Sequence, residues 1–127
     1  MTTTSPHDVY RFLEDRFACA QSCTECARTC ALRAGLAEPD EGPGAEELPR
    51  RSAIMCAEVC DATRRVLAQG GEQGGWDEAA IRGQVEWCRA VCLEGAHLLD
   101  TDPDGAQAAH ACRVCARACA DFLGTLS

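Results

Sequence analysis

CTECARTCA at residues 23–31 and CRVCARACA at residues 112–120 are identical at six of nine positions. Two shorter units, MCAEVC at residues 55–60 and WCRAVC at residues 87–92, share the C-x3-C spacing. Cysteines three or four residues apart lie on one face of an α-helix. The repeat therefore predicts four helices, each of which carries a stripe of thiols.

Turn signals separate the four helical segments, which we expect at about residues 6–35, 49–69, 77–100 and 105–124. Ser5 and Pro6 suit the start of the first helix, because Ser caps helices and Pro is favoured at the first helical position. Pro49 and Asp77 suit the starts of the second and third helices in the same way. Short connections between four long helices predict an all-α protein, an antiparallel up-down four-helix bundle with a Cys-lined core.

The composition agrees with this fold and excludes several partners. The chain has 127 residues, 46% hydrophobic but only 5% aromatic, which favours closely packed helices in a single domain over residues 1–127. A formal net charge of −8 opposes binding to nucleic acid. We find no secretory signal and no stretch of roughly 20 apolar residues for a membrane span, so we expect a cytoplasmic protein without a membrane partner.

The thiol stripes are expected to face the core. At about 100° per residue, the four cysteines of the first helix fall within a stripe about 60° wide. Each stripe continues as Leu, Ile or Phe, which is typical of an inward face. Counted from the end where the first and third helices finish, all cysteines fall in one zone of about three turns. Beyond it we expect an apolar plug: Phe12, Leu13, Val66, Leu67, Ile81, Val85, Phe122 and Leu123.

Eleven cysteines at helical spacing exceed what small buried hydrophobic residues would explain. Intrahelical disulfides are disfavoured, because thiols one turn apart have Cβ atoms roughly 5–6 Å apart, beyond the roughly 4 Å of a disulfide. Zn2+ takes isolated groups of four ligands, and one Fe–S cluster would use only four thiolates. Cu(I) is soft and accepts low coordination numbers, so several Cu(I) ions per chain fit the pattern better.

Over about residues 12–123, these units resemble the bacterial copper storage proteins, which are Cys-rich four-helix bundles that load Cu(I) along their interior. The resemblance implies a cytosolic, non-enzymatic protein that stores or buffers Cu(I). It also implies a homo-oligomer, commonly a tetramer, that receives copper from a copper chaperone or a small-thiol carrier. By resemblance, the metal ligands would be Cys19, Cys23, Cys26, Cys30, Cys56, Cys60, Cys88, Cys92, Cys112, Cys115 and Cys119.

The chain departs from that family in its number of cysteines. Members usually carry more of them along the whole core, whereas other residues occupy inner positions here: Thr63, Leu67, Gly95 and Leu99. We therefore expect a smaller copper capacity. Family members often place a His ligand at the open end, but by helical phase His97 and His110 point away from the thiols. Met55 is also rotated off the thiol stripe.

Two other functions stay open at the level of sequence. A redox or catalytic protein with a small copper or Fe–S cluster in the same core would also need a confined set of thiolates. A thiol-based sensor or partner-binding bundle would change its packing on oxidation. No Ser/His/Asp arrangement, inward carboxylate pair or phosphate-binding glycine loop supports hydrolytic or phosphoryl chemistry, so we expect no enzyme.

Overall fold

The computed structural model describes residues 5–36, 47–69 and 77–126, and within them it contains four helices and no strand. The helices are α1 (Pro6–Leu36), α2 (Glu47–Gln69), α3 (Glu78–Leu99) and α4 (Ala106–Leu123). Each helix begins and ends within two residues of the position expected from sequence. The predicted all-α fold is confirmed.

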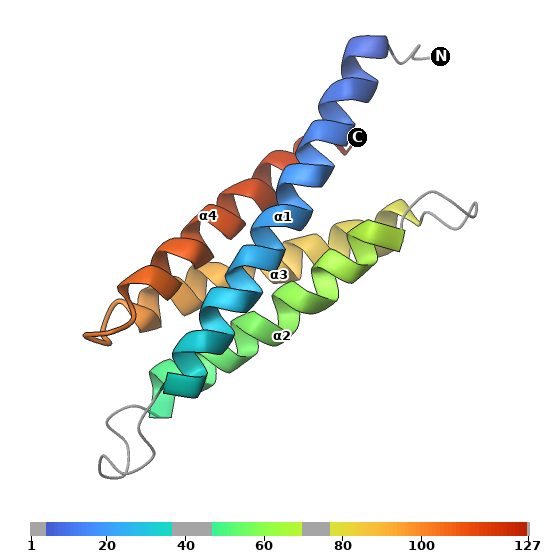
Figure 1. Cartoon of the computed structure of the whole chain (residues 1–127). Coiled ribbons are helices and arrows are strands. Elements are labelled where there is room, and N and C mark those ends of the chain that lie inside the picture. Colours follow the sequence, from blue (N-terminus) through green and yellow to red (C-terminus); the bar gives the residue numbers. More distant parts are fainter. Residues whose placement is uncertain (1–4, 37–46, 70–76, 127) are drawn as a thin grey trace.

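The four helices form a closed ring of neighbours. α1 packs against α2, α2 against α3 and α3 against α4, and α4 returns to pack against α1. Successive helices run in opposite directions, as Figure 1 shows. α1 is the longest, with 31 residues, and its N-terminal turns project beyond the other helices (Figure 1). This is the antiparallel up-down arrangement, and it surrounds one shared core.

Side-chain caps fix two of the helix starts. Ser5 Oγ accepts the N–H of Asp8 at 3.2 Å, and Asp77 Oδ1 accepts the N–H of Ala79 at 3.0 Å. Each contact satisfies a backbone donor that the first turn of a helix leaves open. α2 begins at Glu47, two residues earlier than predicted, and Pro49 lies within its first turn, where a missing N–H costs no helical hydrogen bond.

An apolar plug closes one end of the core, as predicted. Its buried residues are Leu67, Ile81, Val85 and Phe122, and its partly buried residues are Phe12, Val66 and Leu123. The rings of Phe12 and Phe122 join α1 to α4, with centroids 5.6 Å apart. The assignment of Leu13 to the plug is wrong. Leu13 is 36% exposed, because one residue of helix turns its side chain about 100° away from Phe12.

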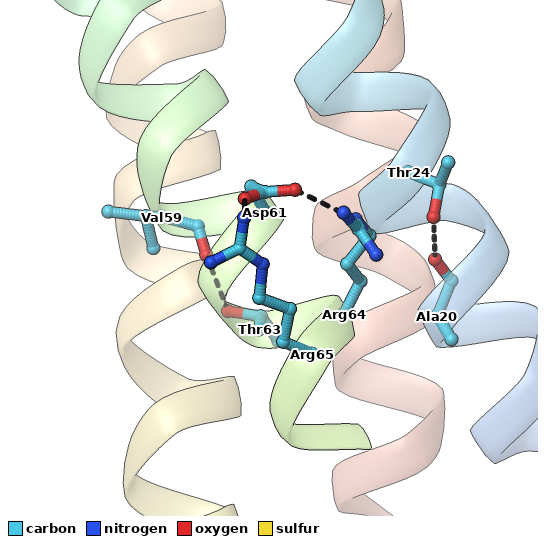
Figure 2. Close-up of polar contacts among 7 residues, drawn as sticks. All are labelled: Ala20, Thr24, Val59, Asp61, Thr63, Arg64 and Arg65. Atoms are coloured by element: carbon cyan, nitrogen blue, oxygen red, sulfur yellow. Dashed lines mark hydrogen bonds and ion pairs between the residues drawn. The ribbon is translucent and has the colours of Figure 1, made fainter. Parts of the chain in front are cut away.

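Polar contacts lie on the outer faces of α1 and α2 beside the thiol zone. Figure 2 shows Asp61 of α2 between two guanidinium groups, with 2.8 Å to Arg64 Nε and 2.8 Å to Arg65. On α1, the Thr24 hydroxyl donates to the Ala20 carbonyl at 2.9 Å. None of the described helices combines the length and the hydropathy that crossing a membrane requires.

Candidate metal centre

All eleven cysteines lie in the core and are fully buried. None of them forms a disulfide. Every helix contributes: four cysteines come from α1, two each from α2 and α3, and three from α4. The predicted thiol cluster is therefore present, with sulfur atoms from all four helices directed into one interior zone.

The sulfur atoms lie close to one another but are not bonded. The following Sγ–Sγ distances run from 3.5 to 3.9 Å: Cys60–Cys92, Cys30–Cys112, Cys19–Cys119, Cys26–Cys112, Cys23–Cys115, Cys60–Cys88, Cys60–Cys115, Cys23–Cys88 and Cys26–Cys30. With a metal–sulfur bond of about 2.3 Å, two sulfurs on one ion lie about 4.0 Å apart in trigonal and about 4.6 Å apart in linear coordination. The observed spacing therefore needs only small side-chain movements to accept an ion.

Three groups of thiols in the described part of the chain have all their sulfur atoms within 4.8 Å of one another. The plug-side group contains Cys23, Cys88, Cys115 and Cys119. The middle group contains Cys26, Cys60, Cys92 and Cys115. The turn-side group, next to the connection between α3 and α4, contains Cys26, Cys30 and Cys112.

Shared thiols join the three groups into one continuous array. Cys115 belongs to both the plug-side and the middle group, and Cys26 belongs to both the middle and the turn-side group. A thiolate that serves two groups can bridge two metal ions. The array therefore suits linked monovalent ions of low coordination number better than separate tetrahedral Zn2+ sites, each of which takes four ligands of its own.

Two cysteines extend the array at its ends. Cys19 lies nearest the plug, with its Sγ 3.7 Å from that of Cys119, and hydrogen bonding with Cys119 lowers the pKa of Cys19 to about 5. Cys56 lies toward the other end, with its Sγ 3.7 Å from the carbonyl oxygen of Val91. All eleven predicted ligands are thus placed in or beside the array.

The pKa is lowered for four of the thiols: Cys19, Cys88, Cys112 and Cys115. Hydrogen bonding with Cys26 and further thiols lowers the pKa of Cys112, and hydrogen bonding with Cys119 and further thiols lowers that of Cys115. The neighbours respond in the opposite sense. The hydrogen bond with Cys112 raises the pKa of Cys26, and that with Cys115 raises the pKa of Cys119. A thiol with a lowered pKa gives up its proton more readily than its neighbours, since hydrogen bonding to the charged form stabilises a thiolate.

A buried ion pair lies toward the end of the bundle opposite the plug. Arg33, three residues after Cys30, contacts Asp102 in the connection between α3 and α4, with Nε and Oδ2 2.5 Å apart. The side chains are 10% and 1% exposed. The other Asp102 oxygen accepts the N–H of Asp104 at 3.1 Å, so the carboxylate also shapes this turn. Sequence reasoning missed this pair. Its signals were an Arg near the thiol stripe and the turn sequence TDPDG.

Polar groups also mark the boundary toward the plug. The buried Thr63 hydroxyl donates to the Val59 carbonyl at 2.8 Å, as Figure 2 shows, and accepts from Gln84 at 2.9 Å. Arg16 donates to the Leu67 carbonyl through two nitrogens, at 2.6 and 2.9 Å. Thr63 occupies the inner position predicted from sequence. On α2 it follows Cys60 on the inward face, so the inward-facing side chain at this level is a hydroxyl and not a thiol.

The two histidines near the open end lie outside the array. His97 and His110 are both exposed, in agreement with their predicted helical phase. Met55 is 51% exposed and lines a groove between α2 and α3. The donor set of the buried centre therefore consists of sulfur atoms from cysteine.

The chain is similar to a known protein family and to several solved structures. The family model "Csp: Copper storage protein" matches residues 5–124 of the chain. The fold is similar to that of a histidine-to-alanine mutant of Streptomyces lividans Ccsp, with a TM-score of 0.79, 28% identity, and coverage of 90% of this chain and 96% of that chain. A double histidine-to-alanine mutant of Ccsp gives a TM-score of 0.78 at 28% identity, covering 89% and 96% of the two chains.

A third similar structure shows copper loading to a cytosolic copper storage protein from Streptomyces lividans, with five coppers. Its TM-score is 0.77 at 28% identity, and the likeness covers 87% of this chain and 93% of that chain. Among curated proteins, none matches the chain.

Proposed function

The chain belongs to the copper storage protein family, and from that membership we propose that it stores or buffers several Cu(I) ions in its core. The single observation that carries the proposal is the array of linked thiol groups, in which Cys26 and Cys115 are each shared by two groups. The proposed ligands are Cys19, Cys23, Cys26, Cys30, Cys56, Cys60, Cys88, Cys92, Cys112, Cys115 and Cys119.

The electrostatics of the core support a monovalent cation as cargo. Thiolate charge in an apolar interior is costly unless it is paired. Each Cu(I) ion carries one positive charge and offsets one thiolate, so ions and thiolates can enter the low-dielectric core together. Binding releases thiol protons. The thiols with lowered pKa values, Cys19, Cys88, Cys112 and Cys115, are the expected first anchors.

The complete burial of the array suits storage. The apolar plug blocks one end, and all eleven cysteines are fully buried. The metal would lie away from water, among thiols that are fully buried. We therefore propose a non-enzymatic role, in which retention of the ion is the function.

Location, assembly and delivery complete the proposal. The cytosolic copper storage protein from Streptomyces lividans supports a cytoplasmic location. We propose a homo-oligomer, with a tetramer as the expected state, and delivery of Cu(I) by a copper chaperone or a small-thiol carrier. Size-exclusion chromatography with light scattering would test the assembly.

Titration of the reduced apo-protein with Cu(I), in competition with a chromogenic Cu(I) chelator, tests the function. We expect several ions per chain, bound tightly enough to outcompete the chelator. Protein whose thiols were alkylated in denaturant is the control and should bind none. Saturation at one ion or fewer would overturn storage. Anaerobic reconstitution with iron and sulfide separates the Fe–S alternative, which requires stoichiometric labile sulfide.

A further inference from the structure

Gly95 of α3 lies directly against the Cys56 thiol of α2. It is buried, and a Cβ atom added to it would come closer than 3.0 Å to Cys56 Sγ, a separation that real Cβ atoms do not show. The same position lies 3.3 Å from Ser52 Oγ and 3.7 Å from Cys112 Sγ. The space that a side chain would fill is therefore taken by sulfur.

The absence of a side chain lets the Cys56 sulfur approach the backbone of α3. Cys56 Sγ lies 3.7 Å from the carbonyl oxygen of Val91, one turn before Gly95. Cys56 and Cys112 Sγ both lie within 4 Å of the missing Cβ position. The Cys56 thiol of α2 and the Cys112 thiol of α4 therefore both lie beside Gly95 of α3.

The Cys56 thiol lies beside the turn-side group, next to Cys112. That group has three thiols, Cys26, Cys30 and Cys112, whereas the plug-side and middle groups have four each. Together with Cys112, the Cys56 thiol raises the pKa of Cys30, and together with Cys26 it lowers that of Cys112, in keeping with its place beside them. A fourth thiolate at this place would bring the turn-side group to the same number of donors as the other two groups.

We propose that Gly95 is a positioning residue that places Cys56 as the fourth thiolate of the turn-side group. This inference rests on the proposed Cu(I) function and deepens it, because it names the residue that sets copper binding at that end. Any larger residue at this position would turn the Cys56 side chain away from Cys112. The turn-side group would then hold its ion with three thiolates.

Gly95→Ala tests the proposal, with Gly83→Ala as the matched control. Both glycines lie in α3, but a Cβ on Gly83 meets no atom within 4 Å. Gly83→Ala should bind copper like the wild type. In Gly95→Ala the weakest-bound ion should lose about 10- to 100-fold in affinity, the usual effect of removing the support of a metal ligand. In the apo form, Cys56 should also react faster with iodoacetamide, as measured by peptide mass spectrometry.

The double variant shows whether the effect passes through the Cys56 sulfur. Cys56→Ala should itself weaken turn-side binding, and adding Gly95→Ala to it should cause no further loss, because no sulfur remains to be displaced. A further loss would overturn the proposal, and so would Gly95→Ala binding copper like Gly83→Ala. If Gly95→Ala does not fold, rescue of folding by Cys56→Ala supports the proposal, and failure of rescue overturns it.

The same titrations separate this inference from the proposed function. If the wild type and Gly83→Ala bind no copper, storage itself fails. If both bind several ions and Gly95→Ala binds them equally well, only the positioning role of Gly95 fails.

Discussion

Replacing Asp102 by Asn should destabilise the apo-protein by about 3 kcal/mol, because it removes one charge of a buried ion pair. The Asp102 side chain is 1% exposed and that of Arg33 10%, so water can replace little of the lost attraction. Removal of one partner from a buried pair costs roughly 3–5 kcal/mol. The lower end applies here, because Arg33 keeps some contact with solvent and Asn keeps the shape of the turn.

Asp100→Asn is the matched control in the same connection. Asp100 pairs with Arg113, but these side chains are 47% and 51% exposed. Exposed pairs contribute about 0–1 kcal/mol, so this substitution should change stability little. Two Asp-to-Asn changes only two residues apart therefore separate the effect of burial from the effect of charge.

The effect of Asp102→Asn should depend on pH. Contact with the Arg33 guanidinium lowers the pKa of Asp102 below its ordinary value of 3.8. As pH falls, the unfolded chain takes up this proton before the folded chain does. The stabilisation is therefore complete above pH 3.8 and is lost as pH falls through the folded pKa. The stability difference between wild type and variant should be constant near neutrality and shrink in acid.

Urea denaturation of reduced apo-protein, followed by circular dichroism, measures both effects. With a slope of about 1.5 kcal/mol/M, a loss of 3 kcal/mol moves the midpoint down by about 2 M. A shift of Asp102→Asn no larger than that of Asp100→Asn would refute the reasoning, because a buried pair would then contribute no more than an exposed one.

Three further predictions concern the metal centre and the plug. Cys115→Ser should lower the number of Cu(I) ions per chain more than Cys19→Ser does, because Cys115 serves two thiol groups and Cys19 none of the three; equal losses in parallel titrations would contradict this. Phe122→Ala should lower the free energy of unfolding by about 3–5 kcal/mol yet leave copper capacity intact, since Phe122 is a buried residue of the plug and its ring packs against Phe12. Urea denaturation and Cu(I) titration of one preparation would measure both quantities. A loss of bound ions would contradict the separation of the plug from the metal centre. Copper affinity should rise with pH, because binding displaces thiol protons; chelator competition across neutral pH measures the slope, and a flat profile would show that the thiols are already ionised in the apo-protein.

The local sequence predicted most of the fold. Helix positions follow from caps and turn residues, and the inward direction of the thiols follows from spacing at three and four residues, since both depend on backbone geometry within one segment. That is why Ser5 and Asp77 cap helices as expected and why all eleven cysteines are buried. The assignment of Leu13 to the plug was wrong because apolar character alone does not set the direction of a side chain. Leu13 follows Phe12 directly, so it points about 100° away from the inward face of the helix.

The tertiary structure decided which sulfur atoms meet. Cys26 and Cys115 link the groups, Gly95 admits Cys56, and Arg33 reaches Asp102 from another part of the chain. These contacts depend on the axial register and rotation of each helix relative to its neighbours, which the packing of all four helices sets together. A helical stripe determines the face on which a thiol lies. It does not determine the partner across the core, because a shift of one turn along a neighbouring helix would replace every partner while leaving the sequence pattern unchanged.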